Sequence, residues 1–147
     1  MATKIGCLVN YGGGSQTIPA RTITPFRFNT LVYDTGLYNT DSFTSTLPVS
    51  GIYLFGVSIY HKNLSLSSSS LPLYYLLYVN DVMVDTQFSI IKGSTQSHHI
   101  SMSWDCNTGD VVRMSVYSPD ADITFTDTDK VDSIDLKGLS SLSITRC

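Results

Sequence analysis

The chain has no glutamate and only three alanines among its 147 residues. Charged residues make up 14% of it, against about a quarter in an ordinary globular domain. Because Ala and Glu are good helix formers, their scarcity excludes a helical bundle and disfavours alternating α/β folds. Polarity comes instead from 21 serines and 16 threonines, beside many Tyr, Val, Ile and Phe residues. This composition predicts an all-β fold.

Excess positive charge and long apolar runs are also missing. Nine Lys and Arg residues face twelve Asp residues, a net charge of −3, so the chain lacks the basic footprint of a nucleic-acid binder. The longest uncharged stretch, 42–61, contains Pro48 and Gly51 and is typical of a turn followed by a strand. The apolar run 5–9 is too short for a secretory leader. We therefore expect no membrane insertion, and whether a leader was removed stays open.

Cysteine is scarce, and its count is odd. Cys7, Cys106 and Cys147 could form one disulfide beside a free thiol, or no disulfide at all. Cys147, at the end of the chain, could also bond to another chain in an oxidising compartment. The one N-glycosylation sequon, Asn63-Leu64-Ser65, is a hint of an extracellular protein. The pattern leaves these alternatives open.

Short apolar stretches alternate with turns along the whole chain. Residues 26–33, 98–105 and 111–117 show period-two alternation, and Asn107-Thr108-Gly109-Asp110 is typical of a hairpin turn. About ten short strands without a helix or repeat predict one β-sandwich or barrel domain over 1–147. The other expected strands are 4–10, a short one from Phe43, Gly51–His61, 73–79, 82–85, 88–91, 123–125 and 136–144.

The stretch Gly51–His61 is the clearest of these strands. Tyr53, Phe55 and Val57 alternate on one side of it, while Ile52 and Leu54 begin an opposite side that is also largely apolar. A sandwich buries only one face of each sheet. We therefore expect a neighbouring subunit to cover the second face.

The order of several motifs resembles the globular head domain of complement C1q. The strongest piece is Pro48-Val49-Ser50-Gly51-Ile52-Tyr53-Leu54-Phe55, preceded by Phe26-Arg27-Phe28-Asn29. Val79-Asn80-Asp81, Gly109-Asp110-Val111-Val112 and Leu136-Lys137-Gly138-Leu139 follow in the order of that family. The likeness covers roughly residues 4 to 145. The chain departs from the family where Arg113 replaces a usual Trp, and no collagen-like tract precedes the domain.

The resemblance implies a ten-stranded jelly roll of the tumour necrosis factor superfamily type, assembled as a homotrimer. Alternation along the two expected strands 51–61 and 111–117 then gives the side chains that point out of the sandwich and would form the trimer contact. The alternative is that these are ordinary surface residues of a monomer. The residues expected at the trimer contact are Leu54, Ser58, Tyr60, Arg113, Ser115 and Tyr117.

Evidence for catalysis is thin, and we expect a protein that is not an enzyme. No Gly-x-Ser-x-Gly motif occurs. His98 and His99 are neighbours in an expected strand, so they point to opposite faces and cannot share one metal ion within a subunit. An acidic segment offers oxygen ligands that suit calcium, which some members of the resembled family bind; the alternative is a solvated acidic loop. Its candidate ligands are Asp120, Asp122, Asp127 and Asp129.

Aromatic side chains beside short polar ones are the usual means of binding sugars. The candidate ligand-binding residues are Tyr60, His61, Ser68, Trp104 and Arg113, of which Arg113 suits a carboxylated sugar such as sialic acid. The leading hypothesis is an extracellular C1q-domain lectin that binds carbohydrate or other microbial surface ligands in innate immunity. The alternatives are a structural trimeric knob or cap on a fibre, and a cytokine-like ligand of a cell-surface receptor.

Overall fold

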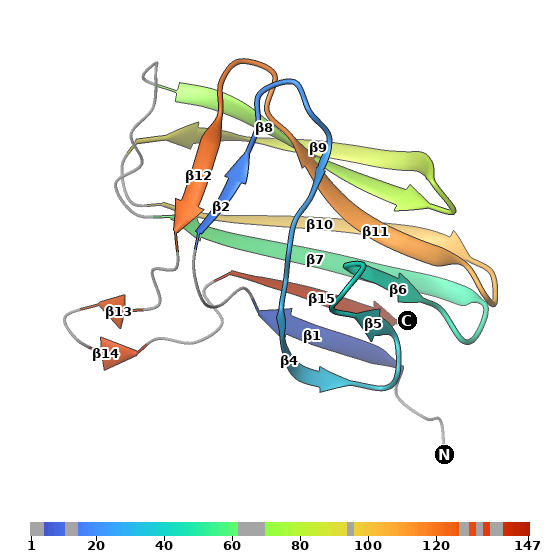
Figure 1. Ribbon diagram of the computed structural model, residues 1–147. Helices are drawn as coiled ribbons and strands as arrows, with labels where there is room; N and C mark the ends of the chain where they lie inside the picture. The colour runs from blue at the N-terminus through green and yellow to red at the C-terminus, as the bar shows by residue number, and fades with distance from the viewer. Residues whose placement is uncertain are drawn as a thin grey trace.

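The computed structural model describes residues 5–10, 15–61, 70–93, 96–126, 130–131, 134–135 and 140–147 (Figure 1). These residues form strands and connecting turns, and none of them belongs to a helix that could span a bilayer. The strands are β1 (Gly6–Asn10), β2 (Ser15–Ile18), β3 (Thr24–Pro25), β4 (Thr30–Asp34), β5 (Tyr38–Asn39), β6 (Thr44–Thr46), β7 (Gly51–His61), β8 (Ser70–Val79), β9 (Val82–Lys92), β10 (Gln96–Cys106), β11 (Val111–Tyr117), β12 (Ile123–Thr126), β13 (Lys130–Val131), β14 (Ile134–Asp135) and β15 (Ser141–Arg146).

Two antiparallel sheets make up the sandwich. The first has the order β10-β7-β15-β1-β4, and the second has the order β5-β6-β11-β8-β9, with β3 paired to β11. Ten strands therefore lie on the two main paths, five on each, which confirms the ten-stranded jelly roll. Two short ladders, β12 with β2 and β13 with β14, stand outside these paths.

The inner faces of the two sheets share one hydrophobic core. On β7, Tyr53, Phe55 and Val57 are buried, as the alternation predicts. The inward side chains of β11 are buried as well, and Phe55 of β7 and Leu77 of β8 line the same small internal space. Side chains from both sheets thus interlock between the layers, and their removal from water stabilises the fold by about 25 cal/mol per Å² of apolar surface.

The predicted strand 26–33 is wrong in its first half. The chain pairs with the second sheet through β3 and joins the first sheet only at β4, so the residues between them cross from one layer to the other. Phe26 and Phe28 are fully buried there, with ring centroids 4.7 Å apart. The amide of Gln16 holds the crossing by donating to the carbonyl of Pro25 at 3.0 Å and accepting from the backbone N–H of Arg27 at 3.1 Å. Alternating apolar residues here fill the core without forming a ladder.

Tight turns at one end of the sandwich connect the long strands. Asn80 and Asp81 have φ values of 50° and 64°, the left-handed pair that a two-residue hairpin needs between β8 and β9. Gly109, with φ of 87°, turns the chain between β10 and β11. The hairpin expected at 107–110 is wrong, because β10 pairs with β7 in the first sheet and β11 pairs with β8 in the second, so this turn connects the two sheets. The Asn80 side chain ties the two turns together, because its Oδ1 accepts the backbone N–H of Val111 at 3.0 Å. The turn of the β8–β9 hairpin is therefore fixed to the start of β11.

Several other expectations meet the structure at single positions. The last strand begins at Ser141, later than predicted, and residues 136–139 lie outside the described residues. Cys7 and Cys106 are buried free thiols, and Cys147 is an exposed one. Of the alternatives that the sequence leaves open, the structure has the one without a disulfide within the chain.

Candidate functional site

The outer face of the first sheet is flat and built mainly from short polar side chains. Along β7 the exposed positions Ile52 and Leu54 retain 53% and 45% of their solvent exposure. Gly56 follows them, and a Cβ there would lie 2.7 Å from Ser143 Oγ on β15. The neighbouring positions on the flanking strands, by register, are Ser101 and Ser103 of β10 and Ser141, Ser143 and Thr145 of β15.

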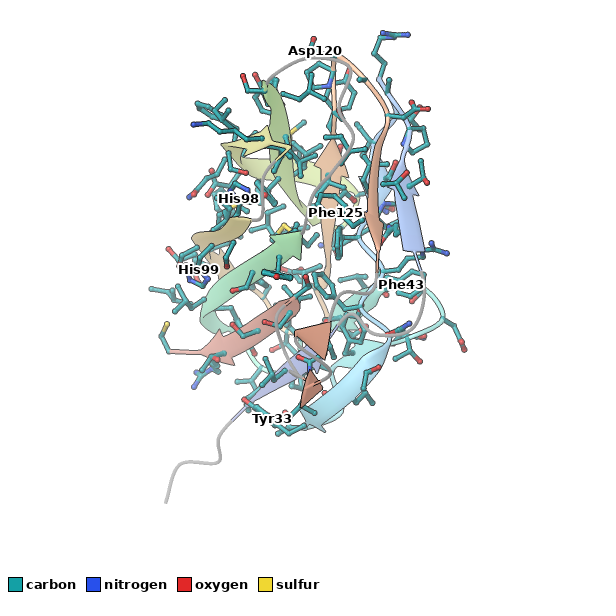
Figure 2. All side chains as sticks on the ribbon, turned by 90° about the vertical axis from the view of Figure 1, so that its left-hand side faces the viewer. Tyr33, Phe43, His98, His99, Asp120 and Phe125 are labelled. Carbon is teal, nitrogen blue, oxygen red and sulfur yellow. The ribbon has the colours of Figure 1, made fainter. Side chains whose placement is uncertain are left out.

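His99 lies on this same face, opposite Ser58. Its Nδ1 atom is 2.9 Å from Ser58 Oγ, and the tautomer of the ring decides which of the two donates. His98, the next residue back on β10, points to the other side and is half-buried, and burial lowers the pKa of its imidazole (Figure 2). The expectation that the two rings face opposite ways is confirmed.

The outer face of the second sheet is different, since aromatic and long side chains cover it. Register and alternation place its residues in three rows across β11, β8 and β9. In the first row the rings of Tyr74 and Phe88 have their centroids 5.8 Å apart. The rows are Tyr117–Tyr74–Phe88, Ser115–Leu76–Thr86 and Arg113–Tyr78–Met83.

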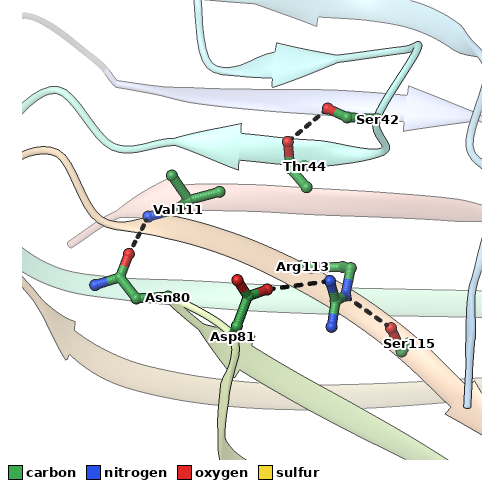
Figure 3. Close-up of polar contacts among 7 residues, drawn as sticks. All are labelled: Ser42, Thr44, Asn80, Asp81, Val111, Arg113 and Ser115. Carbon is green, nitrogen blue, oxygen red and sulfur yellow. Dashed lines mark hydrogen bonds and ion pairs between the residues drawn. The ribbon is translucent and has the colours of Figure 1, made fainter.

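Arg113 closes one end of this surface (Figure 3). Its Nη1 atom lies 3.3 Å from Asp81 Oδ1, and its Nε donates to Ser115 Oγ at 3.3 Å. Its guanidinium carbon lies 4.7 Å from the centroid of the Tyr78 ring. The cation is thus held by a carboxylate, a hydroxyl and an aromatic face at once.

A groove of about 590 Å³ opens beside these rows. Leu76 forms its buried floor, whereas Ile23 and Met83 on its walls are exposed. None of the side chains that line it carries a charge. The groove is lined by Ile23, Tyr74, Leu76, Met83, Thr86, Tyr117 and Pro119.

The structure does not bring the expected trimer-contact residues together. Because β7 and β11 belong to different sheets, their outward side chains leave opposite sides of the sandwich. Ser115 has no exposed surface left to bury against another chain, so its assignment to an interface is wrong: Arg113 and the neighbouring strands cover it. The six divide into Leu54, Ser58 and Tyr60 on the first sheet and Arg113, Ser115 and Tyr117 on the second.

The expected ligand-binding residues are scattered in the same way. Tyr60 is half-buried on β7. Trp104 is exposed on β10 near the opposite end of that pair of strands, where it stands across from Tyr53. Arg113 belongs to the other sheet. The side chain of His61 and the whole of Ser68 lie outside the described residues. The described members of this set therefore do not line one site.

Two of the four expected calcium ligands are described. Asp122 Oδ1 accepts the backbone N–H of Ala20 at 2.7 Å, so this carboxylate already has a structural role. Asp120 lies at the top of the molecule in Figure 2, while Asp127 and Asp129 lie outside the described residues. Among the residues that the structure describes, no group of three His, Cys, Asp or Glu side chains could hold a metal ion. Calcium binding stays a prediction.

The two buried thiols, Cys7 and Cys106, are much less reactive than an ordinary cysteine. Burial, reinforced by the nearby carboxylate of Asp34, raises the pKa of Cys7 to about 12. Burial, followed by the charges of Asp110 and Asp105, raises the pKa of Cys106 to about 11. Both side chains are therefore protonated at neutral pH and act as small core hydrophobes.

One sequence pattern indicates the apolar surface around the groove. In the stretch 73–79 apolar residues occupy both alternating sides, just as they do in Gly51–His61, because Tyr74, Leu76 and Tyr78 stand between inward residues. Phe88 and Ile90 continue the pattern on the next strand. A second two-faced apolar strand indicates that both outer faces of the sandwich, and not one, carry apolar surface.

Comparison with known proteins yields the fold. No family model matches the sequence, and no curated protein matches it. Among solved structures, Eiger TNF from S. frugiperda is 13% identical, with 98% of this chain and 92% of that chain covered and a TM-score of 0.64. Murine APRIL is 10% identical, with 99% of this chain and 100% of that chain covered and a TM-score of 0.59. The chain therefore has the jelly-roll fold that tumour necrosis factor-like and C1q-type domains share.

Proposed function

We propose that this chain is a non-enzymatic recognition module that acts outside the cell and assembles as a homotrimer through the outer face of its first sheet. The observation that carries the proposal is the exposure of Ile52 and Leu54, at 53% and 45%, on a strand with neighbours on both sides. Aliphatic side chains at the middle of a flat sheet face are costly to leave in water. A neighbouring subunit of the same chain is the simplest cover for them.

The face around these two residues suits close association. Its other side chains are mostly Ser and Thr, which are short enough to let two flat surfaces approach. Burying the exposed half of two aliphatic side chains contributes roughly 1 kcal/mol for each side chain. Three copies around one axis repeat that contribution at every contact. Within the first sheet, Leu54, Ser58 and Tyr60 remain the residues that we place at the interface.

The chemistry of this face supports binding more than catalysis. The Ser58–His99 pair resembles part of a nucleophile–base arrangement, but the described hydrogen bonds of His99 include no carboxylate that would orient and charge the ring. Cys7 and Cys106 are too strongly buried to attack a substrate. Recognition by surface contact needs none of these groups.

The ligand is the open part of the proposal. A carbohydrate ligand, with sialic acid as one case, follows from the C1q-like motifs, and three weak sites on one trimer would gain strength by avidity. A cytokine-like protein ligand is the second candidate, and the apolar groove on the second sheet favours it. A glycan array probed with the trimer and with a monomeric variant separates the carbohydrate ligand from the protein ligand, because a lectin retains weak sugar binding in both forms.

Light scattering on three proteins tests the assembly. The native chain should give about three times its mass of 16.2 kDa. Leu54→Arg should give the mass of one chain, since it places a charge in the middle of the contact. Val111→Arg introduces the same charge at an exposed apolar position on the second sheet and should leave the trimer intact. A native chain that is monomeric, or a control that dissociates equally, contradicts the proposal.

A further inference from the structure

The groove on the second sheet lies on the side of the sandwich that the proposed trimer contact leaves uncovered. β8, β9 and β11 form its base, whereas Ile52 and Leu54 belong to the first sheet. Both faces carry exposed apolar residues, and the second is hollowed by the groove. A surface that stays accessible after assembly is where a recognition module would meet its partner.

The composition of the groove identifies the kind of partner. Protein-binding surfaces are enriched in aromatic residues, Met and Arg and depleted in Lys and Asp. The lining has two tyrosines and one methionine and no Lys or Asp, and Phe88 and the Arg113–Asp81 pair stand at its border. A sugar would need several hydrogen-bonding groups for its hydroxyls, but Thr86 and the two phenols are the only polar side chains there. This set suits the side chains of a protein.

Charge selects among protein partners. None of the side chains that line the groove is charged, and Arg113, at one end of the rows, is paired with Asp81 at 3.3 Å and stacked on Tyr78. The groove therefore presents no net charge to an incoming ligand, and a charged side chain that entered it would lose its hydration without gaining an opposite charge. An uncharged apolar side chain loses nothing on entry. The complementary partner surface is apolar and neutral.

The shape of the groove fits anchoring by single side chains. The groove is broadly open to solvent, and its volume of about 590 Å³ lies within the usual range for ligand sites. Leu76 closes the bottom, and Phe88, 58% exposed, extends the aromatic row beyond the groove. Exposed aromatic residues around a buried aliphatic floor are the arrangement in which a few anchors supply most of the binding energy.

We propose that this groove is the docking site for a protein partner that inserts uncharged apolar side chains between Ile23, Tyr117 and Met83. The inference rests on the proposed function in one respect, that the chain is a recognition module; it does not depend on the trimer. Each chain carries its own complete groove, so a trimer would offer three of them.

The test uses the full chain and a phage-displayed library of short random peptides as the probe. Selected peptides should be rich in Leu, Ile, Phe and Met and poor in charged residues. Thr86→Arg, which places a charge in the groove at an exposed position, should weaken binding by about 10-fold or more. Val111→Arg, with the same charge on the same sheet outside the groove, should bind as the native chain does. Circular dichroism and the melting temperature confirm that each variant is folded.

Four results overturn the proposal: no selected peptide, peptides dominated by charged residues, equal binding by Thr86→Arg and the native chain, or release of bound peptide by neutral oligosaccharides. A change of native mass in Thr86→Arg also overturns it, since a second copy would then occupy the groove. Leu54→Arg separates this inference from the trimer. If the native chain is monomeric and Leu54→Arg still binds peptide, the trimer proposal is wrong and the proposed docking site is supported.

Discussion

The two outer faces of the sandwich follow the same rule of alternation but differ in chemistry. The face of the first sheet has Ile52 and Leu54 among several serines, and Gly56 adds no side chain to it. The face of the second sheet has aromatic rows and a groove over Leu76. A flat face with a few aliphatic residues suits a copy of itself, whereas a hollow aromatic face suits the side chains of something else. One strand pattern can thus produce two kinds of interface.

The largest expected effect comes from the core that supports both faces. Phe55→Ala should lower the free energy of unfolding by about 3–5 kcal/mol, because it leaves a cavity where the two sheets meet. Chemical denaturation measures the loss. Leu54→Ala, one residue away on the outer side, should cost less than about 1 kcal/mol when measured on the single chain. Equal losses would show that β7 does not divide into a buried and an exposed side.

Filling the flat face should have the next largest effect. Gly56→Val should destabilise the chain by about 1–3 kcal/mol, because the new side chain displaces Ser143 Oγ and approaches the ring of His99. Urea denaturation gives the difference. Ser101→Val, opposite Gly56 on β10 and exposed, is the matched control and should change stability by about 0.5 kcal/mol or less. A tolerated Gly56→Val would mean that the face does not need to be flat.

The hollow face depends on its arginine. Arg113→Ala should cost about 1–2 kcal/mol, since it removes the contact with the Tyr78 ring and the bond to Ser115 together with the ion pair. Asp81→Asn should cost about 0.5 kcal/mol or less, because the Asp81 side chain is 88% exposed and water screens the pair. The midpoints of urea denaturation compare the two. If Asp81→Asn were the more damaging change, charge and not packing would hold this end of the face.

The smallest effect concerns pH and the half-buried His98. Burial lowers the pKa of His98 in the folded chain, so the unfolded chain binds the proton more readily. Its contribution to stability is fully present above the ordinary histidine pKa of about 6.5 and is lost as the pH falls below it. His98→Gln should reduce the drop in melting temperature between pH 7.5 and pH 5, which thermal melts at the two pH values measure.

Much of the fold could be predicted from the sequence because alternation is a local property. The inward and outward positions of 51–61 and 111–117 follow directly from the order of their side chains. Which sheet each strand joins is not local. The pairing of β11 with β8 and of β7 with β15 depends on contacts between distant residues, and so the expected interface combined two opposite faces.

The crossing at 26–29 could not be predicted from the sequence, for a related reason. Phe26 and Phe28 alternate as they would in a strand, but the segment passes from one sheet to the other: the N–H of Phe26 donates to the carbonyl of Met114 on β11 at 3.3 Å, and the N–H of Asn29 donates to the carbonyl of Asn10 on β1 at 3.0 Å. The buried amide of Gln16, which holds this segment, has no recognisable sequence signal. The groove likewise combines residues from three strands and two connecting segments, and only their assembly creates the hollow.

The most direct test of the account is to ask which face becomes covered when the protein associates. Hydroxyl-radical footprinting, carried out at rising protein concentration and read by mass spectrometry, reports the exposure of individual side chains. Ile52 and Leu54 should become protected as the chains associate, while Met83 and Phe88 stay open to oxidation. Protection of Met83 and Phe88 in place of Ile52 and Leu54, or no concentration-dependent protection, would contradict it.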